Sequence, residues 1–290
     1  MYGYAIFMRK QGVKTMKKNL SILMISVLTS LSLLAGCGQK VDTSKDGIFK
    51  VGMEAAYAPF NWTQADDSNG AVKIEGTKAY AGGYDVEIAK KIAEGLGQEL
   101  VIVKTVWGGL VPALQSGTID AIIAGMSPTA ERKTSIDFTG NYYQSDLVMV
   151  VKKGGAYENA SALADFSGAK ITAQLSTFHY DVIDQIPGVL KETAMDSFAS
   201  LRVGLQSGVI DGYVSEKPGA VSAAEANDDF TYVEFTDGFE VSLDDTAIAV
   251  GIAKGQEDLI SQINGILGEI PLEDQEALML QALKNQPPTE

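Results

Sequence analysis

Residues 110–120 read LVPALQSGTID and residues 201–211 read LRVGLQSGVID, so one pattern occurs twice at an offset of 91 residues. Each copy predicts a helix that ends at a glycine, Gly117 or Gly208, because glycine readily adopts the left-handed conformation that closes many helices. A strand that opens with Ile-Asp follows each glycine. One supersecondary unit is therefore present in each half of the chain, and two copies predict two similar lobes rather than a solenoid.

Around this repeat, short apolar runs alternate with amphipathic stretches. Residues 49–53 and 100–106 predict strands, while residues 83–96 and 110–115 predict helices. Such alternation predicts an α/β fold with mainly parallel sheets. Ligands of open α/β sheets collect beyond the carboxyl ends of the strands, so we expect a binding cleft between the two lobes.

The amino terminus predicts a targeting segment. The first 36 residues contain five lysines and arginines and no acid, and their apolar run, residues 20–35, is too short for a comfortable membrane span. We interpret residues 1–36 as a signal peptide. Met16 followed by two lysines is itself a good opening for such a peptide, so residues 1–15 are a candidate upstream extension from a misplaced start codon.

Cys37 is the only cysteine, and it follows the small residues that end the apolar run. This arrangement resembles the lipobox of bacterial lipoproteins, which predicts lipidation of Cys37 and anchoring to the cell membrane. Residues 37–46 would then be the lipidated cysteine and a flexible tether. The alternative is that Cys37 is a buried free thiol.

Charge and composition exclude several classes of function. The formal net charge is −14, and removal of the five positive charges of the signal peptide brings it to −19. This value argues against nucleic acid as a partner and against electrostatic docking to anionic lipid. One histidine and no second cysteine predict no disulfide, no metal cluster and no cofactor.

The two strands that follow the repeated helices end in side chains of opposite charge. Residues 121–124 lead into GMSPTAER, which ends at Arg132, and residues 212–214 lead into SEKP, which contains Glu216. A free amino acid is a zwitterion and needs a cation for its carboxylate and an anion for its ammonium group. Arg132 and Glu216 are candidates for these roles, although each alone could be an ordinary surface charge.

Five motifs occur in order along the chain: VGMEAAYAPF (51–60), GYDVEIA (83–89), WGGLVPAL (107–114), GMSPTAER (125–132) and IDFT (136–139). With them the sequence resembles the family 3 solute-binding proteins of polar amino acid ABC transporters, over residues 47–285. The resemblance implies a type II periplasmic-binding-protein fold. It places residues 47–148 and 246–290 in lobe 1 and residues 152–244 in lobe 2, with crossover strands at 147–151 and 246–250 as the hinge.

The resemblance also implies a set of ligand-binding residues from both lobes. Gly125, Ser127 and Arg132 would hold the ligand carboxylate, and Glu216 its ammonium group, at a position where the family often has the shorter Asp. The remaining expected ligand-binding residues are Glu54, Tyr57 and Trp107 around the ligand side chain, and Ser176 and Thr177 in a closing loop of lobe 2. Packing within the protein is the alternative for the two aromatic residues.

Glu54 bears on the choice of ligand. A buried carboxylate is costly when unpaired, so Glu54 favours a basic amino acid; if it points to solvent, a neutral polar ligand such as glutamine fits equally well. His179 is expected to pack in the lobe 2 loop or to contact a ligand-binding residue indirectly.

The sequence thus predicts a monomeric binding protein, not an enzyme. It would capture a polar or basic amino acid outside the cell membrane and deliver it, by hinge closure, to an ABC permease and its ATPase. Two alternatives stay open: an enzyme on the same fold, such as a dehydratase, and a surface adhesin or sensor lipoprotein.

Overall fold

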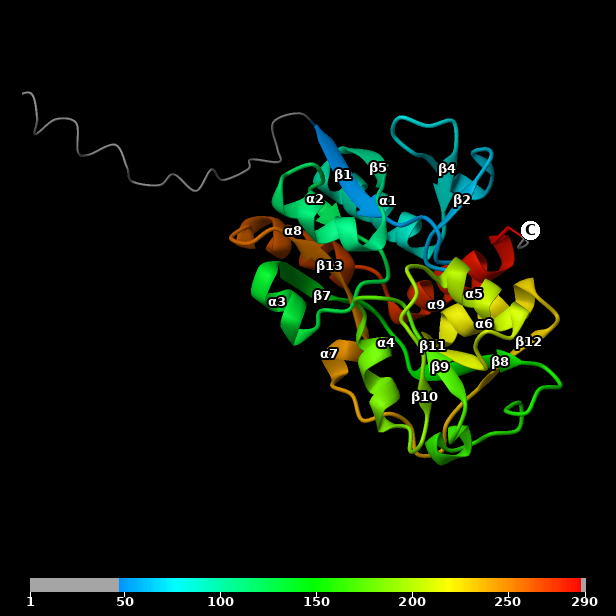
Figure 1. Cartoon of the computed structure of the whole chain (residues 1–290). Coiled ribbons are helices and arrows are strands. Elements are labelled where there is room, and N and C mark those ends of the chain that lie inside the picture. Colours follow the sequence, from blue (N-terminus) through cyan, green and yellow to red (C-terminus); the bar gives the residue numbers. More distant parts are fainter. Residues whose placement is uncertain (1–46, 288–290) are drawn as a thin grey trace, which may run out of the picture. The chain divides into compact units, whose positions relative to one another are not determined.

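The computed structural model describes residues 47–287, which contain two five-stranded sheets, a small three-stranded sheet and flanking helices (Figure 1). The predicted signal peptide (residues 1–36), Cys37 and the tether (residues 37–46) lie outside the described residues. Within residues 47–287, no helix has both the length and the apolar character needed to cross a membrane.

The first sheet has the strand order β5-β1-β6-β13-β7. Strands β5 and β6 run parallel to β1, whereas β13 runs antiparallel to β6 and β7. The carboxyl ends of β1 and β6 therefore meet at one edge, from which the chain continues to Glu54 and to Gly125. The strands are β1 (Ile48–Met53), β5 (Glu99–Lys104), β6 (Ala121–Ile122), β7 (Asp137–Gln144) and β13 (Ala247–Ile252).

The second sheet has the order β10-β9-β11-β8-β12, and β11 runs parallel to β9 but antiparallel to β8. Its strands are β8 (Leu147–Lys152), β9 (Lys170–Thr172), β10 (Leu190–Lys191), β11 (Gly212–Glu216) and β12 (Phe230–Val233). We call the elements around the first sheet lobe 1 and those around the second sheet lobe 2. The small sheet consists of β2 (Trp62–Gln64), β3 (Val72–Lys73) and β4 (Tyr80–Gly82).

The α-helices flank these sheets. They are α1 (Tyr84–Leu96), α2 (Leu110–Gln115), α3 (Ala130–Ser135), α4 (Phe178–Asp181), α5 (Phe198–Ser207), α6 (Lys217–Ala226), α7 (Leu243–Thr246), α8 (Glu257–Gly268) and α9 (Leu272–Asn285). The prediction of an α/β fold is confirmed, but the expectation of mainly parallel sheets is wrong, because β13 pairs antiparallel with β6 and β7, and β8 with β11 and β12.

The sequence repeat corresponds to equivalent structure in the two lobes. Helix α2 is followed by Gly117 at φ 74°, and α5 by Gly208 at φ 78°, so both helices end in the left-handed conformation that favours glycine. Strand β6 follows the first helix and β11 the second, as the pattern predicts.

The aspartates of the two repeats make the same contact. Asp120 accepts a hydrogen bond from the Lys50 backbone N–H at 2.8 Å, and its own backbone N–H donates to the Lys50 carbonyl. Asp211 forms the matching pair with Lys170, also at 2.8 Å. The carboxylate thus extends the parallel ladder by one hydrogen bond, which explains why both copies end in Ile-Asp.

The chain crosses between the sheets just before β8 and before β13. Leu147, the first residue of β8, already pairs with Glu216 in the second sheet. Strand β13 pairs within the first sheet along its whole length. The first crossing is therefore the short segment of Ser145 and Asp146 and not the strand that follows it.

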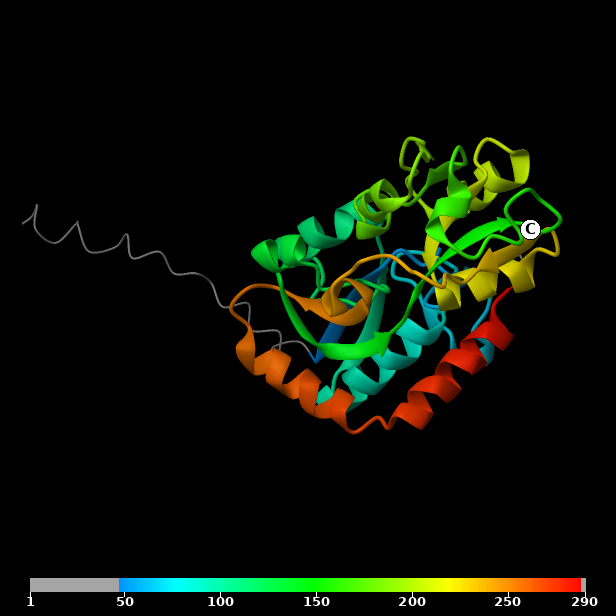
Figure 2. The same ribbon diagram turned by 90° about the horizontal axis from the view of Figure 1, so that it is seen from below.

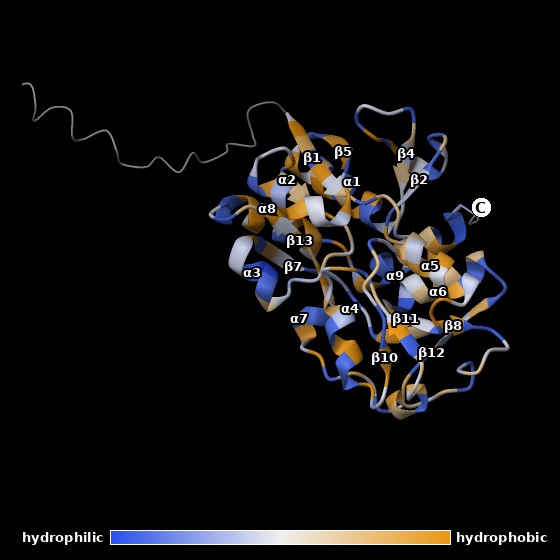
Figure 3. Cartoon of the chain, in the orientation of Figure 1, coloured by the Kyte–Doolittle hydropathy of each residue, from blue (hydrophilic) through white to orange (hydrophobic). Residues whose placement is uncertain are grey.

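Two apolar cores lie against the sheets. The larger surrounds β1 and α1, includes Phe49 and Tyr84, and continues into lobe 2 at Leu201 and Tyr213, whereas the smaller lies wholly in lobe 2 around Met149 and Phe166. Figure 3 shows the hydrophobic colour concentrated in strands such as β1, β5 and β13, and hydrophilic colour on the outer helix α3. This is the pattern expected when helices cover a buried sheet.

Helix α9 contacts both lobes, since it packs against α1 and against α6 (Figure 2). At its end, the Gln286 Nε2 donates to the Ser222 carbonyl at 3.4 Å, and the Ser222 hydroxyl donates back to the Gln286 Oε1 at 2.5 Å. The carboxy-terminal helix is thus a further connection between the lobes besides the two crossings.

Candidate functional site

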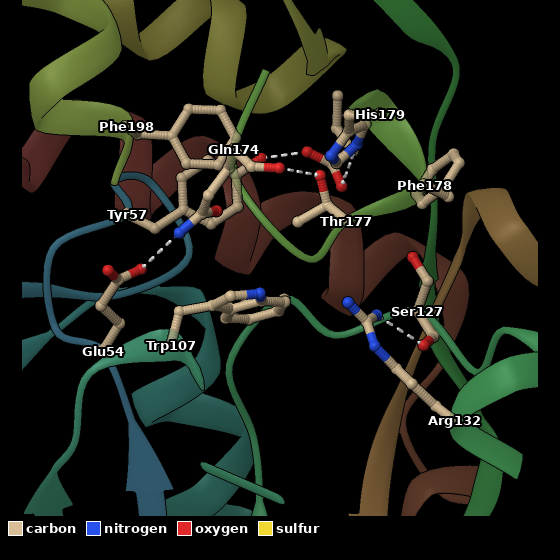
Figure 4. Close-up of a pocket in the computed structure, with 12 residues that line it drawn as sticks. Glu54, Tyr57, Trp107, Ser127, Arg132, Gln174, Thr177, Phe178, His179 and Phe198 are labelled. Carbon is tan, nitrogen blue, oxygen red and sulfur yellow. Dashed lines mark hydrogen bonds and ion pairs between the residues drawn. The ribbon is translucent and has the colours of Figure 1, made fainter. Parts of the chain in front are cut away.

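A pocket lies where the two lobes meet, and both contribute equally to its wall (Figure 4). Lobe 1 provides Glu54, Tyr57, Trp107, Gly125, Ser127 and Arg132, and lobe 2 provides Gln174, Thr177, Phe178, His179, Phe198 and Glu216. The cavity between these residues leaves about 10 Å³ for the centre of a water molecule, so it holds about one water molecule. Anything larger requires the walls to move apart.

Eight of the nine expected ligand-binding residues line this pocket, and Ser176 does not. The Ser176 side chain is exposed, and its backbone adopts φ 61°, in the left-handed region. Its carbonyl instead accepts hydrogen bonds from Arg132 at 3.1 Å and from the Trp107 Nε1 at 3.4 Å. Ser176 therefore joins the lobes through its backbone.

The Arg132 side chain supplies the positive charge of the pocket. One guanidinium nitrogen donates to the Ser127 carbonyl at 2.9 Å, and the guanidinium lies over the Trp107 ring at 5.1 Å. Burial lowers the pKa of Arg132 to about 10, against the opposing effect of Glu131 and Glu216. Within residues 47–287 no carboxylate lies at ion-pair distance from Arg132, so its charge faces carbonyl dipoles and an aromatic ring.

Local sequence explains how Arg132 reaches the pocket. Thr129 caps helix α3, because its hydroxyl accepts a hydrogen bond from the Arg132 backbone N–H at 3.3 Å. Upstream, Gly125 adopts φ 62°, and a Cβ at this position would lie 3.2 Å from the Tyr57 ring. Glycine thus allows the turn between β6 and α3 to pass close beneath Tyr57.

Glu216 supplies a negative charge at the end of β11, and it is buried between side chains of both lobes. The Tyr57 hydroxyl donates to one carboxylate oxygen, and the His179 Nε2 lies 3.0 Å from the other. Burial acts to raise the pKa of Glu216, but the nearby His179 and the hydrogen bond from Tyr57 outweigh it and hold the pKa below its ordinary value. Both oxygens of Glu216 thus have partners.

Aromatic rings close the pocket across the lobes. Tyr57 stacks on Phe198 with ring centroids 4.1 Å apart and an interplanar angle of 11°. Phe60 stacks on Tyr57 at 5.1 Å. Tyr57 therefore touches lobe 2 through its ring as well as through its hydroxyl.

Glu54 follows β1 and is half-buried at the pocket wall. The Gln174 Nε2 of lobe 2 donates to its carboxylate at 3.3 Å (Figure 4). Burial raises the pKa of Glu54, and the hydrogen bond from Gln174 offsets only part of this effect. The carboxylate has a neutral partner and is thus less well compensated than Glu216.

Four lining residues were not predicted from the sequence: Gln174, Phe178, His179 and Phe198. His179 was expected in loop packing or in an indirect contact, but it lines the pocket and pairs with Glu216 directly. The sequence feature that could have indicated His179 is that the only histidine lies beside the predicted closing loop. Nothing in the sequence indicated Phe198 except its place at the start of the second repeated helix.

Within the described part of the chain, no group of three or more histidine, cysteine, aspartate or glutamate side chains could hold a metal ion. The chemistry of the pocket is that of fixed charges, hydrogen bonds and aromatic faces. Such a set suits a small zwitterion.

The model of the bacterial extracellular solute-binding proteins, family 3, matches residues 49–281. The chain belongs to this family. The expected family and the type II periplasmic-binding-protein fold are thereby confirmed.

Relatives of this family 3 protein include the probable histidine-binding protein of Campylobacter jejuni, which is 31% identical over 233 residues, 78% of this chain and 84% of the relative. Others are named for arginine, cystine and glutamine. Among solved structures, an amino acid ABC transporter substrate-binding protein of Streptococcus pneumoniae bound to L-arginine is 27% identical, with a TM-score of 0.72 over 82% of this chain and 94% of its own. An ancestral amino acid-binding protein, described as a precursor of cyclohexadienyl dehydratase, is also 27% identical, with a TM-score of 0.67 over 82% of this chain and 96% of its own.

Proposed function

We propose that this family 3 protein binds one free amino acid with a basic or polar side chain, outside the cell membrane, and delivers it to an ABC importer by hinge closure. One observation carries the proposal: Arg132 is a half-buried cation without a carboxylate partner among the described residues, in a pocket that also contains Glu54 and Glu216. A ligand carboxylate would supply the missing partner. Arg is suited to this role because its planar fork binds a carboxylate bidentately.

The rest of the pocket matches the other parts of an amino acid. The α-ammonium group would approach Glu216, and the side chain would lie between the aromatic rings and extend toward Glu54. A basic side chain would neutralise Glu54, whose raised pKa reflects burial beside a neutral partner. The names of the relatives, which include histidine and arginine, support a basic ligand without deciding among them.

The contacts between the lobes support hinge closure. Tyr57, Trp107 and Glu54 of lobe 1 all touch residues of lobe 2 at the pocket. A ligand that touches both lobes favours the closed state by its differential affinity for that state. Because the pocket leaves room for about one water molecule, the lobes must separate before an amino acid enters.

The cellular setting belongs to the same proposal. Residues 1–36 would be removed as a signal peptide, and lipid on Cys37 would anchor the protein through the tether of residues 37–46. The lobe boundaries would be residues 47–146 with 246–290 and residues 147–244, which differs from the predicted boundary because Leu147 and Val148 pair with β11 in the second sheet. The protein would act as a monomer, without cofactor or catalysis, beside a permease and its ATPase.

A thermal-shift screen of the purified protein against the twenty amino acids, ornithine, citrulline and cystine tests this function. A ligand at about 100 times its dissociation constant stabilises the folded state by about 2.7 kcal/mol. We expect a shift of roughly 5 to 10 °C for lysine, arginine or a related amino acid. Arg132→Ala should abolish the shift, and Arg202→Ala, which changes the other described arginine, should keep it.

The contrary outcomes are distinct. No shift with any of these compounds, for protein shown to be free of retained ligand, would contradict amino acid binding and favour an adhesin or sensor. Consumption of the bound compound, followed by NMR over hours, would favour an enzyme on the same fold. A shift that persists in Arg132→Ala would contradict the role of Arg132.

A further inference from the structure

The pairing of His179 with Glu216 has a consequence for ligand binding. Glu216 is 2% exposed and His179 is 4% exposed, so the two groups meet out of contact with water. The 3.0 Å between the Nε2 of His179 and the Oε1 of Glu216 is an ion-pair distance when the imidazole is protonated. His179 then supplies the positive charge that a buried carboxylate requires.

The charged form of His179 depends on this contact. Within residues 47–287 neither of its ring nitrogens has a hydrogen-bond partner, and Nε2 meets Glu216 at ion-pair distance. Phe178 lies against the imidazole with ring centroids 4.3 Å apart, and Phe198 faces it edge-on at 6.5 Å. An imidazolium among apolar rings, with neither ring nitrogen hydrogen-bonded, is costly unless the charge of Glu216 compensates it.

Other charged and titratable groups near His179 act less directly. They are Tyr57 through its bond to Glu216, Arg132 and Glu54 on the lobe 1 wall of the same pocket, Asp85 beyond Tyr57, and Tyr180 and Asp181 on α4 itself. Glu216 is the partner that contacts the imidazole. A second cation bound at Glu216 would therefore remove the main interaction that favours the protonated form of His179.

We propose that His179 is a positioning residue whose protonated imidazole is the counter-cation of Glu216 in the absence of ligand. The ligand ammonium group then replaces the imidazolium charge, so that amino acid binding releases a proton from His179. This inference rests on the proposed function, in which the ammonium group binds at Glu216. The Nε2–H bond breaks, its electron pair stays on the neutral imidazole, and the proton leaves to solvent as the lobes open and close around the ligand. The net charge of the site is thus unchanged when the ammonium group arrives.

The sign of the pH dependence follows from proton release. Acid opposes a step that releases a proton, so the dissociation constant should rise by up to about tenfold for each unit of falling pH while His179 exchanges its proton.

Calorimetry of the purified protein with L-arginine, in buffers of different ionisation enthalpy between about pH 5.5 and pH 8, measures the protons released. L-glutamine serves as the probe if the screen selects a neutral side chain. We expect a maximum approaching one proton for the natural chain and none for His179→Gln, whose dissociation constant should vary less than about twofold over the same range.

A second measurement needs no variant. Since the chain contains one histidine, its imidazole resonances in an NMR spectrum report His179 alone. Addition of the amino acid should move them from the positions of the charged form to those of the neutral form. Binding without proton release and without this change would overturn the inference and leave the proposed function intact, whereas no binding by any amino acid would contradict both.

Discussion

Two carboxylates are buried within residues 47–287, and they differ in their partners. Asp85, in the first turn of α1, accepts hydrogen bonds from the Asn61 Nδ2 and the Tyr142 hydroxyl, both at 2.7 Å. These donors are neutral, and burial raises the pKa of Asp85 to about 6 in spite of them. Glu216 is paired with His179 and Tyr57, and its pKa is lowered.

The difference separates a structural carboxylate from one at a binding site. Neutral donors orient Asp85 inside the core of lobe 1, where Tyr142 in turn accepts a hydrogen bond from the Gly125 backbone N–H at 3.3 Å. Glu216 has His179 and the Tyr57 hydroxyl beside it, at the boundary between the lobes, and these hold its pKa below the ordinary value. Glu54 resembles Asp85 in its neutral partner and raised pKa, but it faces the pocket.

The largest expected effect comes from removing the charge of Glu216. Glu216→Gln should weaken amino acid binding by roughly 30-fold to 5,000-fold, because removal of one partner of a buried charge pair costs 2–5 kcal/mol. Calorimetry at pH 7 measures the loss. Asp85→Asn is the matched control and should change the dissociation constant by less than about threefold, since Asp85 lies outside the pocket. Equal losses in the two variants would remove the distinction between the carboxylates.

Asp85 should instead affect how stability depends on pH. Its pKa in the folded protein, about 6, exceeds the ordinary value of 3.8, so the folded state binds this proton more tightly. The stability that results is present at acid pH and is lost as the pH rises through about 6. The difference in unfolding free energy between the natural chain and Asp85→Asn should fall by about 2 to 3 kcal/mol between pH 4 and pH 7.

Urea denaturation at several pH values measures this difference. Glu216 has the opposite sign, because a lowered pKa contributes stability above the ordinary value of 4.5 that is lost as the pH falls through the folded-state pKa. If the difference for Asp85→Asn is independent of pH, the raised pKa of Asp85 is wrong.

Substitution of Glu54 tests whether a carboxylate with a neutral partner selects a cationic ligand. Glu54→Gln should weaken binding of L-arginine by about tenfold and leave L-glutamine within about twofold, because a partly buried ion pair is worth about 1 to 2 kcal/mol. Competition calorimetry with the two amino acids gives the ratio. Glu75→Gln, which changes an exposed acid paired with Lys50 at 3.1 Å, should leave the ratio unchanged.

The smallest effect is expected at Tyr57. Tyr57→Phe keeps the stack on Phe198 and removes the hydroxyl that donates to Glu216. Loss of this hydrogen bond should weaken binding by roughly 3-fold to 10-fold, which corresponds to about 0.5–1.5 kcal/mol. Phe60→Leu, beyond the pocket lining, provides a control for altered packing. A larger loss in Tyr57→Phe than in Glu216→Gln would mean that the hydroxyl contacts the ligand itself.

Much of the fold and part of the site could be predicted from the sequence. Periodicity and glycine stops are local properties, and they located β1, α1, α2 and the repeated unit that ends in Asp120 and Asp211. Arg132 and Glu216 could also be predicted as site residues, because Arg132 follows β6 in the chain and Glu216 ends β11. The structure brings these residues into one pocket.

Pairings between the lobes could be recognised only in the tertiary structure. Tyr57 and Glu216 are separated by 159 residues, and their contact depends on the register of two sheets and on how the lobes meet. The same is true of the Tyr57–Phe198 stack and of the Ser176 carbonyl, which accepts a hydrogen bond from Arg132.

The sequence by itself determined the α/β repeat, the family and the two opposite charges, since each depends on residues that are close in the chain. Only the tertiary structure decided that Arg132 lacks a carboxylate partner within the described residues while Glu216 has a histidine beside it. The physical reason is that the charge state of a buried group depends on its neighbours in space. Those neighbours come from distant segments that folding brings together.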